Sequence, residues 1–337
     1  MAKPSSLKFC IITDGGQQLG MGHVQQSITL ANLLCDKGEV IFFTKSGQMV
    51  LTAIRRNGFL ATHFHSDNDI LAQLIIENPN VVIFDKLDVS EQFALDIKLQ
   101  LNARLAIFTN LTQANQYADV SVLQRSVDLF TDVSLRFKNI RTTSNNPKRC
   151  SFSGPRYWIL RPEFYKPYPI IKKSDPGPKR ILLFFGGSDP SNFTCSALSI
   201  LSHSRRNYKI DIILGPCFAY KKQVRNIANN CEPGVAISIY ENVTNVAYIM
   251  LQTDLVITSA GISMFEALRL GRPVLVIPQD ELQKQTYEGL IQMVNPSELH
   301  KLLSILDQRD FTFGNDPRIV DLQIGQGFQE LVHELLC

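Results

Sequence analysis

Short apolar runs alternate with amphipathic segments along the first half of the chain. Four runs rich in β-branched and aromatic residues predict strands, and the segments after them carry apolar residues at helical spacing. The expected strands are Phe9–Thr13, Glu39–Thr44, Val81–Asp85 and Arg104–Thr109, and the expected helices are Val24–Cys35, Met49–Arg56, Asp69–Glu77 and Ser90–Leu101. This alternation predicts βαβ units and a parallel sheet covered on both faces.

The pattern stops in the middle of the chain and then starts again. Thr142–Pro147 is turn-rich, and prolines recur between Pro167 and Pro178 with charged residues among them, which is typical of a linker. The strands expected after it are Arg180–Phe185, Tyr208–Leu214, Val235–Tyr240, Asp254–Thr258 and Pro273–Ile277. The last apolar-periodic run, Ile324–Leu336, predicts a helix.

We therefore expect an α/β protein with two Rossmann-like, doubly wound domains that face a cleft. The first domain would span residues 1–165 and carry the chemistry, followed by a linker over 166–178. The second would span residues 179–323 and bind a nucleotide. Residues 324–337 would form a C-terminal helix, for which packing back on the first domain is one arrangement. A length of 337 residues favours two domains over one.

Composition narrows the class of protein. A hydrophobic content of 45% and a charged content of 19% are ordinary for a globular chain, and a net charge of +3 gives no support for nucleic-acid binding. No stretch approaches the roughly 20 apolar residues that span a bilayer. We expect no membrane span, while peripheral attachment and the oligomeric state stay open. The seven cysteines are dispersed without a Cys-x-x-Cys pair, which favours reduced thiols and a cytoplasmic location over a disulfide frame or zinc site.

The segment Gly20-Met21-Gly22-His23 lies between the first expected strand and the first expected helix. Glycines allow a tight turn and a close approach of the backbone to a ligand. An imidazole at a strand-to-helix turn is placed where α/β enzymes bind ligands, and it exchanges protons near neutral pH. His23 is thus a candidate general base, and Asp14, at the end of the same strand, is a candidate to orient it or to bind substrate.

Two loops in the second half suit a phosphate or pyrophosphate. Gly186-Gly187-Ser188 follows an apolar strand, and Ser191-Asn192 is expected to cap the helix after it. Ser259-Ala260-Gly261-Ile262-Ser263 opens a helix that carries Glu266. Helix N-termini offer unpaired N–H groups to anions, and Glu266 could accept hydrogen bonds from ribose hydroxyls. Either loop alone could equally be a simple turn, but the pair favours a ligand.

Two other clusters give weaker signals. His63 and His65 are two residues apart and could ligate a metal, but no Cys or further His completes a site, so surface histidines are favoured. Asp67-Asn68-Asp69 imitates a metal-binding Asp-x-Asp motif, yet its place before a helix favours a turn and cap. We expect no metal and no cofactor.

Taken together, four motifs resemble one family. They are the glycine–histidine segment at Gly20–Val24, the run Tyr157–Phe164, the loop Gly186-Gly187-Ser188-Asp189-Pro190, and Ser259-Ala260-Gly261 with Glu266–Pro273. The chain resembles, over nearly its whole length, the nucleotide-sugar hydrolases of pseudaminic acid synthesis (PseG-like) and the related spore-coat polysaccharide (SpsG-like) proteins. That family has the GT-B architecture, which it shares with the MurG glycosyltransferase.

The resemblance implies a function and a set of site residues. It implies that His23 helps to activate water. The residues expected to contact the substrate are Gly20, Gly22, Asp85 and Arg161. It implies that the second domain holds uridine diphosphate through its two loops, with Glu266 on the ribose. The nucleotide-binding residues would be Gly186, Gly187, Ser188, Val243, Val246, Ser259, Ala260, Gly261, Ser263 and Glu266.

The chain also departs from the family pattern in its sugar-binding half. Gln25-Gln26 replace a Met-Arg pair, and Leu87 stands where an Asp-x-Tyr motif has its tyrosine. The preferred reading is a hydrolase that releases UDP from a UDP-linked amino or deoxy sugar in surface polysaccharide or pseudaminic-type acid synthesis. The alternatives are a GT-B glycosyltransferase that uses a UDP-sugar donor, and a nucleotide-sugar-binding protein whose catalytic half has decayed.

Overall fold

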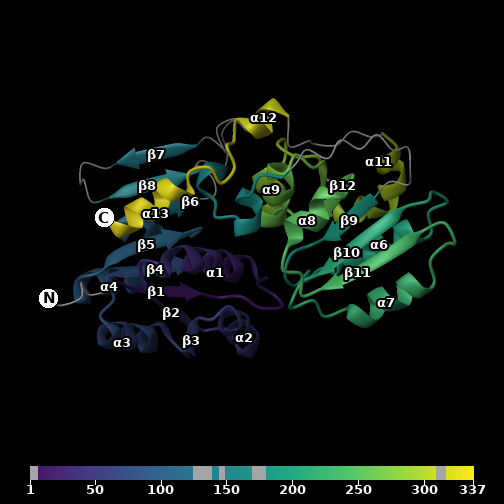
Figure 1. Cartoon of the computed structure of the whole chain (residues 1–337). Coiled ribbons are helices and arrows are strands. Elements are labelled where there is room, and N and C mark those ends of the chain that lie inside the picture. Colours follow the sequence, from purple (N-terminus) through teal and green to yellow (C-terminus); the bar gives the residue numbers. More distant parts are fainter. Residues whose placement is uncertain (1–6, 124–138, 144–148, 169–179, 309–315) are drawn as a thin grey trace. The chain divides into compact units, whose positions relative to one another are not determined.

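The computed structural model of the protein describes residues 7–123, 139–143, 149–168, 180–308 and 316–337. The chain folds as two compact units. The first comprises Met1–Leu19, His23–Ile159 and Leu322–Cys337, and the second comprises Gly20–Gly22 and Leu160–Asp321 (Figure 1). The division at Ile159 falls before the expected boundary at residue 165, and most of the expected linker, 166–178, lies outside the described residues.

The first unit is built on a sheet that has eight strands within the described residues. Their order is β3-β2-β1-β4-β5-β6-β8-β7, and all neighbours are parallel except β7 and β8. The strands are β1 (Leu7–Thr13), β2 (Gly38–Thr44), β3 (Leu60–His63), β4 (Val81–Asp85), β5 (Arg104–Phe108), β6 (Val120–Leu123), β7 (Ile140–Thr143) and β8 (Cys150–Ser153). The order confirms the predicted doubly wound fold, because the direction of winding reverses between β1 and β4.

Helices connect these parallel strands. They are α1 (Gly22–Leu34), α2 (Gln48–Arg56), α3 (Asp67–Glu77), α4 (Glu91–Gln100) and the 3₁₀ helices η1 (Gln113–Tyr117) and η2 (Pro155–Tyr157). The start of α3 confirms the expected cap: Ser66 accepts from the Asp69 N–H at 3.1 Å, and Asp69 accepts from the Ser66 N–H at 3.0 Å.

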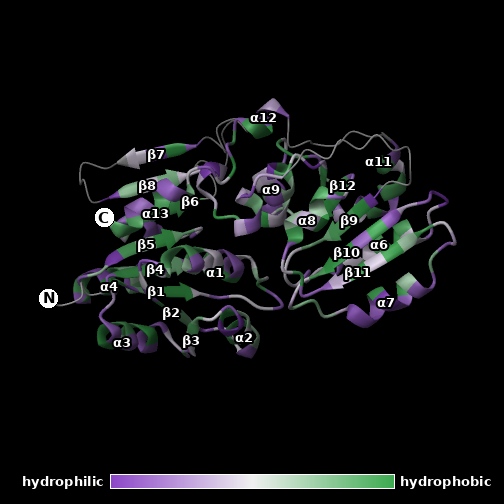
Figure 2. Ribbon diagram, viewed as in Figure 1, coloured by the Kyte–Doolittle hydropathy of each residue, from purple (hydrophilic) through white to green (hydrophobic). Residues whose placement is uncertain are grey.

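The central strands are buried on both faces, as the continuous apolar runs predict. Every residue of β4, Val-Val-Ile-Phe-Asp, is buried. In Figure 2 the central strands of the first sheet are coloured mainly as hydrophobic, whereas the helices carry both hydrophobic and hydrophilic residues. Side chains from alternate strand positions pack with Ile70, Leu74 and Phe93 of the covering helices in one core cluster.

The end of the chain belongs to the first unit. Helix α13 (Phe328–Leu336) lies over the β5–β8 part of the sheet (Figure 1). Its Glu334 pairs with Arg104 of β5 at 3.6 Å and with Arg141 of β7. The expected helix over Ile324–Leu336 therefore begins four residues late, because Gly325 has a left-handed φ of 70° and residues 325 and 327 donate their N–H groups to Pro155 and Arg156.

The second unit repeats the arrangement with a smaller sheet. Its described strands are parallel, in the order β11-β10-β9-β12-β13. They are β9 (Arg180–Phe184), β10 (Lys209–Leu214), β11 (Ala236–Glu241), β12 (Leu255–Thr258) and β13 (Val274–Val276). The helices are η3 (Pro162–Tyr165), α6 (Phe193–Ser202), α7 (Lys221–Asn229), α8 (Val246–Leu251), α9 (Ile262–Arg269), α10 (Glu281–Tyr287), η4 (Pro296–Lys301), α11 (Leu302–Gln308) and α12 (Pro317–Val320).

Two sequence expectations need correction. Thr142, expected in a turn-rich stretch, lies in β7, and residues 144–147 lie outside the described part. The short strands β3, β6, β7 and β8 were not expected. Each has four residues, which are too few for an alternation of apolar and polar side chains to be distinguished from a loop sequence.

Candidate active site

In both units the functional loops follow the strands at which the strand order reverses. His23, near the start of α1, follows β1, and Asp85 ends the neighbouring strand β4. In the second unit, residues 186–189 follow β9 and residues 259–261 follow β12. Ligands of open α/β sheets bind at the carboxyl ends of such strands. Each unit thus presents its candidate residues at its own switch point.

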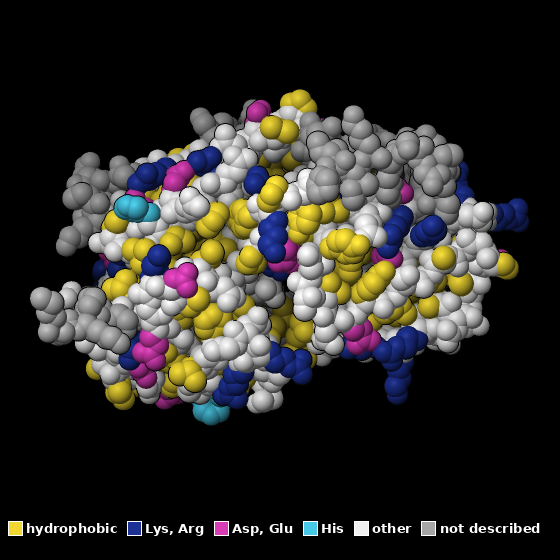
Figure 3. All heavy atoms as spheres, in the orientation of Figure 1, with side chains coloured by type: hydrophobic (Ala, Val, Ile, Leu, Met, Phe, Trp, Pro, Cys, Tyr) yellow, Lys and Arg dark blue, Asp and Glu magenta, His cyan; other side chains and the backbone are white. Residues whose placement is uncertain are grey.

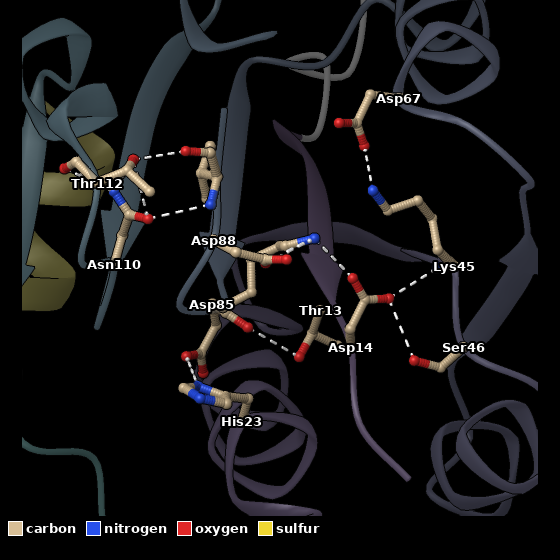
Figure 4. Close-up of polar contacts among 12 residues, drawn as sticks. Thr13, Asp14, His23, Lys45, Ser46, Asp67, Asp85, Asp88, Asn110 and Thr112 are labelled. Carbon is tan, nitrogen blue, oxygen red and sulfur yellow. Dashed lines mark hydrogen bonds and ion pairs between the residues drawn. The ribbon is translucent and has the colours of Figure 1, made fainter. Parts of the chain in front are cut away.

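His23 is held by Asp85. Its Nδ1 lies 2.9 Å from Asp85 Oδ1, and the two side chains face each other in Figure 4. The carboxylate is 1% exposed and also accepts from the hydroxyls of Ser27, at 3.2 Å to Oδ2, and Thr109, at 3.0 Å to Oδ1. Both oxygens of Asp85, which was expected to contact substrate, are therefore engaged within the first unit, and one of them orients the imidazole.

The surroundings of His23 favour its charged form. Burial alone would lower the pKa of His23, but the hydrogen bond and negative charge of Asp85 outweigh it, with smaller contributions from the charges of Asp88 and Asp14. The pKa of His23 is raised above its ordinary value. No hydrogen bond links its Nε2 to another described residue, and 21% of the side chain is exposed.

Asp14 lies in a separate polar cluster, not against His23. Its carboxylate accepts from the Lys86 ammonium at 2.7 Å and from the Lys45 N–H at 2.8 Å (Figure 4). It also accepts from the Thr44 hydroxyl at 3.0 Å. Burial alone would raise the pKa of Asp14, but the hydrogen bond and charge of Lys86, helped by Lys45 and Thr44, lower it. Asp14 was expected either to orient His23 or to bind substrate. Because its hydrogen bonds go to Lys86, Lys45 and Thr44, the binding of substrate is the role that is left to test.

Lys86 was not expected at the site. Its ammonium lies 2.7 Å from Asp14 Oδ2 and 3.2 Å from Asp88 Oδ1, and its side chain is 8% exposed. The burial of Lys86 would lower its pKa, but the hydrogen bond and charge of Asp14, followed by those of Asp88, raise it. The sequence could have indicated Lys86 as a site residue, because it directly follows Asp85, the last residue of the buried strand β4.

In the second unit, the first expected anion site is filled by the chain itself. The N–H groups of Phe193 and Thr194, at the start of α6, donate to the Asp189 carboxylate at 3.0 and 2.7 Å. The expected cap by Ser191-Asn192 is wrong: Asn192 is left-handed (φ 55°) and its side chain makes no cap hydrogen bond. Asp189 is 2% exposed. Its carboxylate therefore occupies the N–H groups at the start of α6, where a phosphate was expected to bind.

The Gly186-Gly187-Ser188 loop nevertheless adopts the tight turn that its glycines predict. Gly186 has a left-handed φ of 81°, and Ser188 is buried. Gly215, after β10, was missed by sequence reasoning. A Cβ there would lie 2.3 Å from the Gly186 carbonyl oxygen, so a glycine is required for the two loops to approach.

The start of α9 remains suitable for an anion. Gly261 is its N-cap residue and provides no side-chain cap hydrogen bond. Ser259, Gly261 and Ser263 are partly exposed, while Ala260 is buried. This helix end therefore matches the prediction better than that of α6, because its N–H groups face no capping side chain among the described residues.

Glu266 and Arg161 form a buried ion pair. Arg161 donates from Nε to Oε1 at 2.8 Å and from Nη2 to Oε2 at 2.6 Å, and Glu266 is 1% exposed. The guanidinium also lies over the rings of Phe164 and Phe184, at 5.2 and 5.7 Å from their centroids. The Arg161 backbone N–H also donates to Oε1, at 3.4 Å. Glu266, expected on a ribose, thus has two hydrogen bonds on Oε1 and one on Oε2 from Arg161, which was expected to contact substrate itself.

The expected base-binding loop borders a surface pocket. The pocket has a volume of about 430 Å³ and is lined by Tyr240, Asn242, Val243 and Tyr248, among others. Val246, the first residue of α8, is 2% exposed, so its side chain lies in the interior of the unit rather than on the loop surface. Of the two valines, Val243 is the one placed to contact a ligand.

The remaining candidates have simple surroundings. Gly20 has a left-handed φ of 79°, and Gly22 begins α1. The rings of His63 and His65 are 4.9 Å apart, and no group of three or more possible metal ligands occurs in the described residues.

On the face shown in Figure 3, basic and acidic side chains lie interspersed with apolar ones. Within the described segments, none of the helices has the length and apolar character needed to cross a bilayer.

Comparisons with known sequences place most of the second unit in a described domain family. Residues 181–301 match the glycosyltransferase family 28 C-terminal domain. An uncharacterised protein of Methanocaldococcus jannaschii is 37% identical over 334 residues, which are 98% of this chain and 66% of the archaeal protein. The chain therefore spans slightly less than two thirds of that relative. The spore coat polysaccharide biosynthesis protein SpsG of Bacillus subtilis is 25% identical over 283 residues, 82% of this chain and 78% of SpsG.

Solved structures share the fold at low sequence identity. MurG of Acinetobacter baumannii matches with a TM-score of 0.61 at 12% identity, over 98% of this chain and 99% of that one. Anabaena HepE, solved with UDP-glucose, matches with a TM-score of 0.53 at 11% identity, over 97% and 95% of the two chains. The two doubly wound units and the likeness to these structures agree: the chain has the GT-B fold, and its sequence is similar to SpsG and, over residues 181–301, to the glycosyltransferase family 28 C-terminal domain.

Proposed function

We propose that this protein is a nucleotide-sugar enzyme that hydrolyses the bond between the sugar and UDP. The observation that carries the proposal is the His23–Asp85 pair at the switch point of the first unit. An imidazole with a buried carboxylate on Nδ1 and no described hydrogen bond on Nε2 has the arrangement of a general base. The second unit would hold the nucleotide, and the first unit would act on the sugar.

In the proposed reaction His23 takes a proton from water at Nε2. The water oxygen forms a bond with the anomeric carbon, and the bond from that carbon to the phosphate oxygen breaks. UDP leaves with the electron pair. Its negative charge would be stabilised by the N–H groups at the start of α9, which carry the positive end of the helix dipole. Asp85 would stabilise the imidazolium that forms.

The nucleotide part of the proposal rests on α9. Its Gly261 N-cap suits the diphosphate, and Glu266, held by Arg161, would accept a hydrogen bond from a ribose hydroxyl with the remaining lone pair of Oε2. Val243, beside the surface pocket, would lie near the base. That HepE was solved with UDP-glucose supports a uridine nucleotide as the first ligand to test.

Glycosyl transfer is the second candidate function. The match of residues 181–301 to a glycosyltransferase family 28 domain favours it. In that reaction His23 would take the proton of an acceptor hydroxyl instead of water. Because SpsG is a spore coat polysaccharide biosynthesis protein, we infer that either activity would serve the synthesis of a surface polysaccharide or a related sugar.

Product analysis in ¹⁸O-labelled water tests the proposal. The full chain is incubated with a panel of UDP-linked amino and deoxy sugars, with and without candidate acceptors, and the products are analysed by mass spectrometry. We expect UDP without any acceptor and label at C1 of the free sugar. Label in the phosphate would mean attack at phosphorus, and turnover only with an acceptor would establish the transferase. UDP-sugar binding without any turnover would favour a binding protein.

A further inference from the structure

Thr109, the residue after β5, has an unusual backbone conformation. Its φ is 58°, in the left-handed region. The other non-glycine residues with positive φ in the described part of the chain are Asn78, Asp189, Asn192, Asn242 and Gln323. Asn and Asp tolerate this region, but a β-branched residue there is a genuine outlier. Such strain persists only where the surroundings impose it, and it is often found at functional sites.

The strained conformation places the Thr109 hydroxyl at the centre of the His23–Asp85 pair. Its Oγ1 lies 3.0 Å from Asp85 Oδ1, 3.1 Å from His23 Nδ1 and 2.8 Å from the Phe108 carbonyl oxygen. The Thr109 N–H donates to the Val122 carbonyl of β6 at 2.8 Å, which fixes the backbone. Thr109 is 5% exposed, so water does not compete freely for these contacts.

These contacts select one tautomer of His23. An ionised carboxylate can only accept hydrogen bonds, so Nδ1, 2.9 Å from Asp85, has to carry the ring proton. The Thr109 oxygen can accept a share of the same N–H, while its own proton goes to Phe108 or Asp85. The neutral ring then has its lone pair on Nε2. The other charged groups that act on His23 are Asp88 and Asp14, with Lys86 paired to both.

We propose that Thr109 is a positioning residue, whose hydroxyl holds the Asp85 carboxylate and the His23 ring so that Nε2 is left free to take a proton. The assignment of the tautomer stands on the contacts of the first unit alone. Only its consequence for the reaction rate rests on the proposed function. The two parts can therefore be tested separately.

The tautomer is measured by NMR on the full chain labelled with ¹⁵N-histidine, with the His23 signals identified by their loss in His23→Gln. In the unsubstituted protein we expect the neutral His23 ring to be protonated at Nδ1. Thr109→Val keeps the β-branched shape and removes the hydroxyl that holds Asp85 Oδ1 beside the ring. The carboxylate can then turn away from Nδ1, and a fraction of the Nε2–H tautomer should appear. Thr109→Ser keeps the hydroxyl and should restore the Nδ1–H form. An unchanged His23 spectrum in Thr109→Val would overturn the proposal.

Thr13→Val is the matched control. The Thr13 hydroxyl donates to the backbone carbonyl of Asp85 at 3.1 Å, at the same sheet edge, but does not contact the carboxylate. The His23 tautomer should be unchanged in this variant, and an effect equal to that of Thr109→Val would show general loosening and refute the role. If Thr109→Val does not fold, Thr109→Gly removes the same hydroxyl with a residue that favours positive φ.

Kinetics supply the second readout once a substrate has been found. Thr109→Val should lower kcat/KM about tenfold, the scale of one hydrogen bond to a charged group, and Thr109→Ser should stay near the unsubstituted value. Should no UDP-sugar be turned over, the proposed function fails while the NMR result still decides the role of Thr109. A normal rate in Thr109→Val, despite an altered tautomer, would overturn the link to catalysis.

Discussion

At the scale of single residues, the charge on Asp85 decides how basic His23 is. Burial works against a charged imidazole, and the carboxylate 2.9 Å away more than compensates, so the pKa of His23 is raised. A general base acts in its unprotonated form. A raised pKa therefore places the rising limb of the pH–rate profile above the ordinary histidine pKa of about 6.5.

The variant Asp85→Asn tests how much the negative charge of Asp85 contributes to the pKa of His23, because it removes the charge and keeps the shape of the side chain. The amide removes the negative charge, so the pKa of His23 falls and the rising limb of kcat/KM moves to lower pH. The maximal rate should fall as well, because an amide does not fix the tautomer of the ring. The measurement is kcat/KM between about pH 5 and 9. Asp88→Asn is the control: its side chain is 81% exposed and its contribution is smaller, so a smaller shift is expected. A rising limb that stays in place in Asp85→Asn would mean that another group titrates.

The sequence predicts single residues unequally. His23 could be predicted because a strand, a glycine turn and a helix follow one another locally. Its partner could not: Asp85 is 62 positions away, and only the pairing of β1 with β4 brings Thr13 beside it. Thr109 gives no signal at all, because neither its left-handed backbone nor the direction of its hydroxyl can be read from a threonine.

At the scale of elements, the ion pair between Asp14 and Lys86 joins the carboxyl ends of β1 and β4. Both side chains are largely buried, at 12% and 8% exposure. Removing one partner of such a pair leaves a buried charge without compensation, whereas removing both avoids that penalty. The pair thus connects the two strands between which the winding of the sheet reverses.

A double-mutant cycle measures this connection. Asp14→Asn should lower the free energy of unfolding by up to about 3 kcal/mol, because it leaves the buried Lys86 ammonium with only the exposed Asp88 carboxylate. The double variant with Lys86→Met should lose less than the sum of the single changes, as measured by urea unfolding near neutral pH. Lys45→Met is the exposed counterpart: the pair of Lys45 with Asp67 is 32% and 34% exposed, so about 1 kcal/mol or less is expected. Strict additivity in the cycle would contradict the coupling.

The lowered pKa of Asp14 gives the same pair a dependence on pH. A group whose folded pKa lies below its unfolded value stabilises the protein fully above the unfolded pKa, about 3.9 for Asp. That contribution is lost as the pH falls through the folded value. The acid limb of unfolding should therefore become less steep in the Asp14→Asn variant.

Element ends also show where sequence reasoning reaches its limit. The loops before α6 and α9 both contain glycine and serine and both follow apolar strands, so they give equal predictions. They differ because the Asp189 carboxylate turns back onto the first N–H groups of α6, whereas Gly261 has no side chain to do so. The long buried strands were predicted within one or two residues, since continuous apolar runs leave little choice.

At the scale of the whole molecule, the proposal assigns binding and chemistry to different units. Glu266 and Arg161 belong to the second, and His23 and Asp85 to the first. Substitutions in the two units should therefore separate affinity from turnover.

The comparison of His23→Gln with Glu266→Gln tests this assignment. We expect His23→Gln to leave the Kd for UDP nearly unchanged and to lower turnover by roughly 10²–10⁴, the usual worth of a general base. Glu266→Gln should weaken UDP binding by roughly 1–3 kcal/mol, the scale of hydrogen bonds to a charged group. Calorimetry with UDP gives the affinities. A similar loss of UDP affinity in both variants would contradict the division of roles, and absence of binding to the unsubstituted protein would remove the nucleotide assignment.

The return of Leu322–Cys337 to the first unit has a consequence for how the protein is made. Translation delivers residues 160–321, the bulk of the second unit, before the segment that carries α13. Until then Arg104, Arg141 and Arg156 lack their partners Glu334 and Glu330. The first unit can therefore be completed only after residues 160–321 of the second unit have been made.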